Sequence, residues 1–190
     1  RLRSALERAG VGPGRVALVL PDPLVRLTLL PPGEALPRGR AQRDELLRFK
    51  LRKSVPFEIR DAHVASLQDR AGVGGTVVGA IFTPVLQGYE EVCRSLGLEP
   101  GLVQVSALAL LSAAPEADDR DWLLVNWERG YVTLALVRRG WPMLVRTLTG
   151  ASTLDPGEVS REVATTLLYH RERLGGTPLG RVLLRSGAHP

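Results

Sequence analysis

Residues 121–150 read DWLLVNWERGYVTLALVRRGWPMLVRTLTG, which is three apolar runs separated by two short polar turns. The turns are the sequences ERG at residues 128–130 and RRG at residues 138–140. A charged residue followed by glycine supplies the positive φ angles that a short hairpin needs. The stretch therefore predicts a meander of three antiparallel strands.

A long helix and a further strand follow this meander. Residues 155–158 (DPGE) place a proline in the first turn of the helix and carboxylates at its positive end. The helix carries one apolar stripe at steps of four and three, formed by Val159, Val163, Leu167, His170 and Leu174. Two glycines at 175–176 end it, and residues 181–184 return as a strand. The pattern predicts an α/β unit.

The first 114 residues predict shorter alternating elements. Helices are expected at 2–8, 43–54, 84–96 and 107–113, and strands at 15–20, 24–30, 62–68, 76–83 and 102–105. The strand at 24–30 alternates apolar and polar residues, which indicates one face in water. Ser106 is the expected N-cap of the helix at 107–113. The Gly-rich residues 72–75 favour a hairpin loop rather than a phosphate cradle, because no Lys-Ser/Thr follows them.

Composition bounds the class of protein. The chain has 190 residues, 44% of them hydrophobic, which suits one domain or two small ones. It has one cysteine and no apolar run of membrane-spanning length, and nothing at its start resembles a signal peptide. These features predict a cytosolic protein. Arg1 in place of an initiator methionine predicts that the sequence is part of a longer chain.

The net charge of +5 comes from arginines spread along the chain, with few aromatic residues between them. That distribution argues against a nucleic-acid-binding surface. Most local basic runs are solvated helix faces, and the alternatives here are an acidic partner or an anionic membrane surface. The local cluster consists of Arg38, Arg40, Arg43, Arg48, Lys50, Arg52 and Lys53.

Other chemistry finds little support in the sequence. The three histidines are far apart and have no metal-ligand spacing. His170 lies on the apolar stripe of its helix and is expected to be a core histidine with a satisfied hydrogen bond. The acidic residues Asp118, Asp119 and Asp121 are expected in a solvated loop. No Gly-x-Ser-x-Gly elbow supports a hydrolase that uses Ser106. No cofactor or metal is expected.

Several phrases, in order, resemble the PilM family of type IV pilus assembly and its type II secretion relative GspL. They are VALVLPDPLVRLTLLP, LLRFKLRKSVPF, VVGAIFTPVLQGYEEVCRSLGLEP, VQVSALALLSA, the meander itself and EVSREVATTLLYHR. The resemblance implies an actin-like α/β fold with an inserted FtsA-type 1C subdomain of α+β type. By that comparison residues 1–114 contain the 1C subdomain, and residues 115–190 are part of the second actin-like core.

The resemblance also implies a nucleotide site, from which this sequence departs. An ATP-binding member carries Asp-x-Gly between the first two meander strands, where Asp positions a hydrated Mg²⁺ and Gly admits phosphate. Here Asn126 and Glu128 stand at those positions, and Gly130 comes two residues late. Gly187 is only half of the Gly-Gly turn at the adenosine. The departures predict a degenerate site and a protein that is not an enzyme.

The resemblance implies a cytoplasmic scaffold at the inner membrane, associated with a pilus or type II secretion platform. Expected partners are a PilN-like protein or GspM/GspE-like components, with membrane contact only through a partner and a homodimer also possible. The alternative function is an actin-like ATPase whose phosphate loops lie partly outside this sequence. The hypothesised partner-binding residues are Arg48, Lys50, Arg52, Pro56 and Phe57, with strand 24–30 as a neighbouring edge for an extended peptide.

Overall fold

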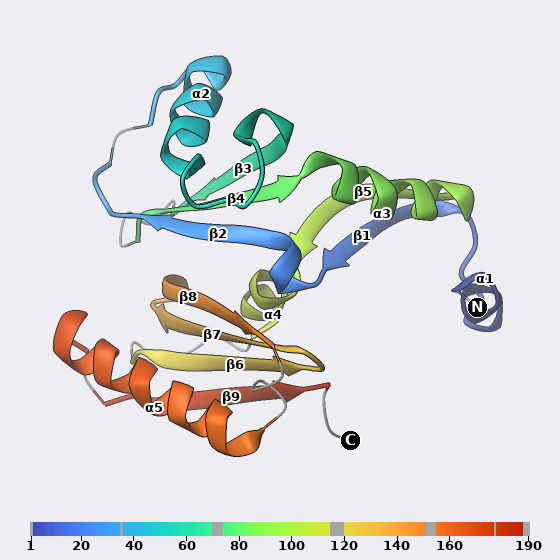
Figure 1. Ribbon diagram of the computed structural model, residues 1–190. Coiled ribbons are helices and arrows are strands. Elements are labelled where there is room, and N and C mark those ends of the chain that lie inside the picture. Colours follow the sequence, from blue (N-terminus) through green and yellow to red (C-terminus); the bar gives the residue numbers. More distant parts are fainter. Residues whose placement is uncertain are drawn as a thin grey trace.

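The computed structural model describes residues 2–34, 36–69, 74–114, 120–150, 155–176 and 178–187. Its C-terminal sheet has the strand order β8-β7-β6-β9, with β6 (Trp122–Glu128), β7 (Tyr131–Arg138), β8 (Trp141–Thr149) and β9 (Arg181–Ser186) (Figure 1). The first three strands form the predicted antiparallel meander, and β9 runs parallel to β6. Gly130 and Gly140 have the positive φ angles expected of the two turns.

Successive residues of a strand point to opposite faces of the sheet, and here a helix covers each face. Helix α5 (Pro156–Arg173) packs its apolar stripe against Leu123 and Val125, and the Asp155 side chain accepts a hydrogen bond at its N-terminus. Helix α4 (Ser106–Ala113) packs against Trp122 and Leu124 on the other face. The strand–helix–strand unit predicted from the sequence is confirmed.

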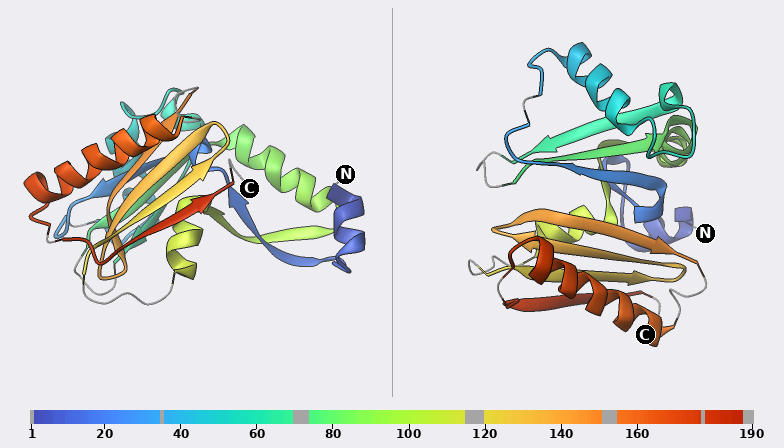
Figure 2. Two further views of the ribbon diagram at one scale, coloured as in Figure 1. Left: turned by 90° about the horizontal axis from the view of Figure 1, so that it is seen from below. Right: turned by 60° about the vertical axis from the view of Figure 1, so that its left-hand side comes forward.

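The N-terminal half contains two further sheets. Strand β1 (Gly14–Leu20) pairs in parallel with β5 (Leu98–Val105) to form a two-stranded ribbon. The segment between them forms an antiparallel sheet of order β2-β4-β3, with β2 (Val25–Leu30), β3 (Ala62–Gln68) and β4 (Thr76–Phe82). Figure 2 shows the ribbon extending away from both other sheets, with α1 (Leu2–Arg8) at its far end. Helix α3 (Thr83–Ser95) connects β4 to β5.

Strand β5 begins four residues before the predicted start. Pro100 pairs with Val16, and Leu102 pairs with Ala17, so Gly101 is an extra residue in the ladder. The ladder therefore has a β-bulge at Gly101, where a side chain would crowd the Arg15 guanidinium. The strand predicted at 102–105 is therefore only the second half of β5.

Helix α2 (Arg40–Leu51) begins and ends three residues earlier than predicted. Gly39 supplies the backbone oxygen that accepts the Arg43 N–H, so the first turn forms before Arg43. The Ser54 N–H bonds to the Leu51 oxygen, a tight turn that ends the helix ahead of Pro56. Arg52 and Lys53 therefore lie in the turn rather than in the helix.

The sequence predicts that the polar face of β2 is exposed to water, but in the structure α2 packs on that side of the sheet. Leu30 shares a face with Val78 and Ala80, which pack against Leu47 and Leu51 of α2. The strongly apolar face, which carries Val25, Leu27 and Leu29, is turned away from α2. The sequence pattern identified the faces correctly but not which one is covered, since that depends on where α2 returns to the sheet.

Candidate functional site

The residues expected at the degenerate nucleotide turn come together where β6 and β9 end. Asn126 stands opposite Arg185 in the parallel register, and the Gly187 N–H donates to the Trp127 oxygen at 2.8 Å. A side chain at Gly187 would collide with the Glu128 carboxylate. Gly130 has φ +93° in the β6–β7 turn with open space around it. Three of the four positions thus share one site, and Gly130 lies in the turn beyond it.

Asn126 is the centre of a buried polar cluster. Its side chain is 0% exposed, and Nδ2 donates to Asp22 Oδ2 at 2.9 Å and to Ser106 Oγ at 3.1 Å. Its Oδ1 accepts from Arg185 Nη1 at 3.1 Å. The amide therefore uses both of its hydrogen-bonding ends on groups from three other parts of the chain. We call this the Asn126 cluster, formed by Asp22, Ser106, Asn126, Glu128, Tyr131 and Arg185.

Asp22 joins the two halves of the chain in this cluster. It is 1% exposed, and its second oxygen, Oδ1, accepts the Ala107 N–H at 2.7 Å. A carboxylate at this position caps α4 and interacts favourably with the positive end of the helix. The predicted cap, Ser106, is instead the first residue of α4, and the N-cap position belongs to Val105. Sequence reasoning missed Asp22 because Pro21-Asp22-Pro23 resembles a simple strand breaker.

Two opposite charges pair at the outer side of the cluster. Glu128 forms an ion pair with Arg185, a partner that the sequence analysis did not consider. Burial, followed by the negative charge of Asp22, raises the pKa of the Tyr131 hydroxyl, which also contacts Ser106 and Asn126. The chain's own side chains therefore bond to one another at the positions where the resemblance implies a phosphate loop.

A second buried polar group surrounds Asp121. Its carboxylate accepts Arg138 Nε at 2.8 Å and Nη2 at 2.6 Å, and lies 2.7 Å from His170 Nε2. The Arg138 hydrogen bond, more than any other influence, holds the pKa of Asp121 below its usual value. The prediction of a core histidine at 170 is confirmed, since it is 3% exposed and bonded. Asp121, expected in a solvated loop, is instead buried; Asp118 and Asp119 lie outside the described residues.

The residues hypothesised for partner binding near α2 are distributed among separate contacts. Arg48 donates to the Ile59 oxygen at 2.7 Å, and Lys50 forms an ion pair with Glu34. Arg52 lies over the Phe49 ring at 4.7 Å. Pro56 is exposed, whereas the half-buried Phe57 packs against Phe82 with 5.3 Å between ring centroids. Arg48 and Phe57 thus contribute to packing within the N-terminal half of the chain.

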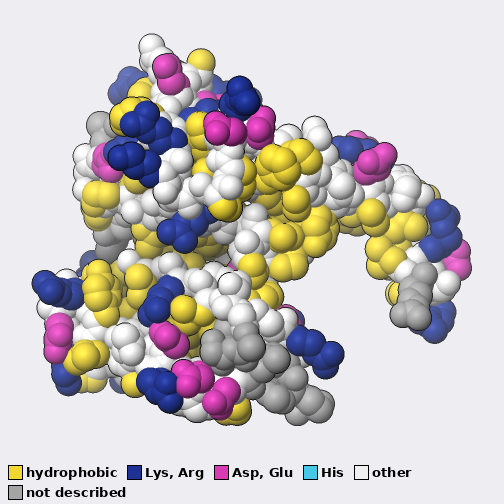
Figure 3. All heavy atoms as spheres, viewed as in Figure 1, with side chains coloured by type: hydrophobic (Ala, Val, Ile, Leu, Met, Phe, Trp, Pro, Cys, Tyr) yellow, Lys and Arg dark blue, Asp and Glu magenta, His cyan; other side chains and the backbone are white. Residues whose placement is uncertain are grey.

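An opening lies on the other side of the same sheet. A pocket of about 410 Å³ separates the open face of the β2-β4-β3 sheet from the ribbon. Figure 3 shows hydrophobic side chains exposed where α3 and the ribbon leave this sheet. We call this pocket the groove; its apolar lining includes Leu20, Val25, Leu27, Leu67, Val77, Ile81, Leu86, Leu102, Val103 and Leu108.

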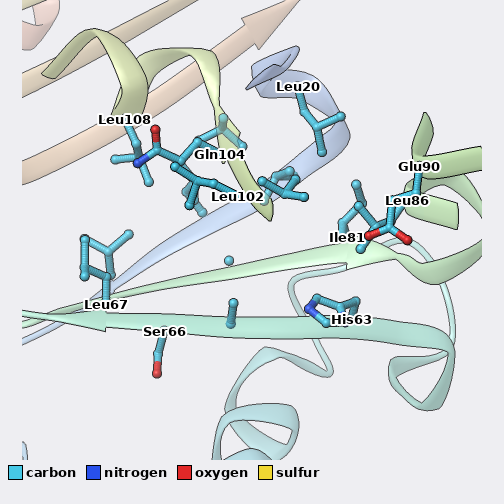
Figure 4. A pocket seen from close by; sticks show the side chains of 17 residues that line it. Leu20, His63, Ser66, Leu67, Ile81, Leu86, Glu90, Leu102, Gln104 and Leu108 are labelled. Carbon is cyan, nitrogen blue, oxygen red and sulfur yellow. The ribbon is translucent and has the colours of Figure 1, made fainter. Parts of the chain in front are cut away.

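Small residues make the floor of the groove deep. The small residues are Ala65 on β3 and Gly79 on β4, which are paired with each other; Leu27 of β2 is paired with Gly79 on its other side. A methyl group on Gly79 would come within 3.3 Å of Val25 Cγ1, so the glycine creates the hollow in the sheet. Figure 4 shows Leu67 and His63 directed from β3 toward Leu102 and Gln104 across the space. The floor can therefore receive an apolar side chain.

The wall of the groove exposes a strand edge. Four consecutive residues of β5, Leu102–Val105, line it. Since side chains alternate along a strand, four consecutive lining residues mean that the groove meets the edge of β5. Among the described residues β5 pairs only with β1, so backbone groups on its other edge are open to a further strand.

Comparison with known proteins identifies the fold. A solved PilM–PilN type IV pilus biogenesis complex contains a chain that matches with a TM-score of 0.77 and 20% identity over 98% of this chain. The cytoplasmic domain of EpsL, an inner membrane component of the Vibrio cholerae type II secretion system, matches with a TM-score of 0.60 and 15% identity over 90% of this chain. This fold is actin-like.

A third solved structure supports that assignment. A Bacteroides thetaiotaomicron protein of unknown function with an actin-like ATPase fold has a TM-score of 0.51 and 11% identity over 98% of this chain. The chain spans 66% of the first matched protein, 62% of the second and 67% of the third. No protein-family model matches the sequence, and no curated protein matches it.

Two further findings concern the residues that the structure describes. None of their helices is long and apolar enough to cross a bilayer. Nor do they contain a group of three or more His, Cys, Asp or Glu side chains arranged to hold a metal ion.

Proposed function

We propose that the protein is a non-enzymatic scaffold of a type IV pilus or type II secretion assembly platform, and that its groove binds an extended segment of a PilN-like partner. The observation that carries this proposal is the groove itself. It is apolar, about 410 Å³ in volume, and bordered by an open strand edge. The structural match to a PilM chain from a PilM–PilN complex supports the choice of partner.

The lining favours a particular mode of binding. A partner segment adds to the edge of β5 through main-chain hydrogen bonds, and every second side chain points to the floor. There an apolar side chain enters the hollow over Ala65 and Gly79. Two exposed leucines, Leu67 at 57% and Leu102 at 51%, become covered by the segment. Burial of such side chains contributes roughly 25 cal/mol per Å² of apolar area.

The same proposal places the protein at the cytoplasmic face of the inner membrane, where a PilN-like partner tethers it. A GspM-like or GspE-like component is a second partner under this proposal, and a homodimer is a third arrangement. Nucleic acid is not expected to bind. The rival binding site is the α2 region with Arg48, Lys50, Arg52, Pro56 and Phe57.

The alternative function, an actin-like ATPase, predicts that the chain binds Mg²⁺-ATP. We propose that the site is degenerate because Glu128 and Arg185 pair across it and Asn126 is fully buried. A ligand present at a hundred times its dissociation constant would stabilise the fold by about 2.7 kcal/mol. Millimolar Mg²⁺-ATP should leave the melting temperature unchanged. A clear Mg²⁺-dependent rise would instead support the actin-like ATPase.

The test of the scaffold uses a synthetic peptide that covers the cytoplasmic tail of the host's PilN-like protein, labelled for fluorescence anisotropy. Ala65→Trp should weaken its binding at least tenfold, because the indole fills the hollow from an exposed position. Ala5→Trp in α1, a helix without buried residues, is the matched control and should bind normally. Equal binding by both variants would refute the groove as the site. Loss of binding only on charge reversal at Arg48 and Arg52 would support the α2 region.

A further inference from the structure

A second surface, on the opposite side of the same sheet, has a different character. Residues 38–53 carry seven basic and two acidic side chains, a net charge of +5 that equals the net charge of the whole chain. The remainder is therefore neutral overall. Figure 3 shows basic side chains gathered over α2 at the upper left of the molecule. The positive charge is local and not a property of the whole surface.

An apolar side chain stands in the middle of this charge. Phe49 is 61% exposed on the outer face of α2, while Leu47 and Leu51 on the inner face are each 1% exposed. The Arg52 guanidinium lies 4.7 Å from the centre of the Phe49 ring. An exposed aromatic ring flanked by cations is the arrangement that lets a helix lie on an anionic bilayer, with the ring among acyl chains and the cations at the headgroups.

Several of the cations are available for such contacts. Among the residues that the structure describes, no carboxylate forms an ion pair with Arg38, Arg40, Arg52 or Lys53, and all four are exposed. Lys50 is paired with Glu34, and Arg43 donates to backbone oxygens of Pro37 and Arg38. The acidic groups on the helix are Asp44 and Glu45, and Glu45 lies one turn before Phe49 on the exposed face.

We infer that α2 and the turn after it bind directly to an anionic phospholipid surface, with Phe49 inserted and Arg52 and Lys53 at the headgroups. Leu47 and Leu51 bury the inner face of α2 against the sheet, so only the outer face with Phe49 is free to meet a surface. The groove lies on the other face of the sheet. A chain bound to lipid through α2 can therefore still receive a partner segment.

Flotation with phosphatidylglycerol-containing vesicles tests the inference, with neutral phosphatidylcholine vesicles as the reference. The full chain should float with the anionic vesicles, and binding should fall steeply with added salt. Arg52→Glu with Lys53→Glu should reduce binding at least about tenfold, since each basic residue near an anionic surface contributes to attraction. Phe49→Ser should also reduce it, whereas Glu45→Gln should increase it.

The matched control is Arg171→Glu with Arg173→Glu, an equal change of charge at exposed positions of α5. It should leave vesicle binding within about twofold of the native chain. Flotation that is absent, insensitive to the α2 substitutions, or equal on neutral vesicles would overturn the inference. Binding of a poly-glutamate peptide in place of the vesicles, lost in the α2 variant, would overturn it in favour of an acidic protein partner. Peptide binding in the groove is measured separately and is unaffected by any of these outcomes.

Discussion

The groove and the Asn126 cluster are two candidate sites of one chain with opposite chemical character. The groove is lined by apolar side chains, and its residues Leu67 and Leu102 are more than half exposed. The Asn126 cluster is polar and filled, and Asp22 and Asn126 are at most 1% exposed. Covering the exposed apolar side chains of the groove with a partner is favourable. The polar groups of the Asn126 cluster, in contrast, already have hydrogen-bond partners within the chain.

That difference suggests a division of roles. The Asn126 cluster joins the segment after β1, the start of α4 and the C-terminal sheet through Asp22. It joins the N-terminal half, whose residues line the groove, to the C-terminal sheet. The stability of the framework and the binding of a partner should therefore respond to different substitutions.

The largest effect is expected for Asn126→Asp. The substitution replaces the amide that donates to Asp22 by a second carboxylate in a fully buried site. Uncompensated charge of this kind costs on the order of 3–5 kcal/mol, although Arg185 offsets part of the repulsion. Urea unfolding should record the loss. Adding Asp22→Asn should restore part of it in a double-mutant cycle. A change below about 1 kcal/mol would mean that the cluster does not join the two halves.

The second largest effect on stability is expected for the buried polar group around Asp121, and it depends on pH. Asp121→Asn removes the partner of Arg138 and should cost about 2 kcal/mol at neutral pH, a value discounted because the Arg138 side chain is 34% exposed. The Asp121 pKa is lowered in the folded protein, so the unfolded chain takes up a proton first as the pH falls. The stabilisation is complete above the usual carboxylate pKa and is lost as the pH falls through the lowered value.

The measurement is the difference in unfolding free energy between the native chain and Asp121→Asn from pH 6 down to pH 2. This difference should be constant above about pH 4.5 and should shrink below it. Glu172→Gln, at an exposed position, should show no such trend. A difference that does not change with pH would contradict the assigned role of Asp121.

The smallest effect is expected for Gly79→Ala in the groove. Its new methyl group would lie 3.3 Å from Val25 Cγ1, a contact that a half-buried valine can relieve, so stability should change by less than about 1 kcal/mol. Partner peptide binding should weaken by a few-fold, because the methyl group occupies the floor. A large loss of stability with normal peptide binding would contradict the binding role of the groove and the structural role of the Asn126 cluster.

The sequence predicted the C-terminal sheet well and the candidate site poorly. Turn glycines at 130 and 140, and the Asp155-Pro156 helix start, are local signals that fix their own elements. The groove has no such signal, since it depends on which face of β2 receives α2 and on how far β5 extends beyond its bulge. Asp22 and Arg185 act on residues 104 and 59 positions away, respectively. Alternation along β2 did reveal the apolar row to which the groove residues Val25 and Leu27 belong.

Binding of a partner segment in the groove can be tested by a methyl NMR titration with the PilN-like tail peptide. Leucine methyl groups should be labelled in the full chain of 20.6 kDa. We predict that the resonances of Leu27, Leu67 and Leu102 shift with peptide, while those of Leu47 and Leu51 beneath α2 remain in place. Shifts confined to Leu47 and Leu51, with the groove leucines unmoved, would exclude the groove and assign the partner to the α2 surface.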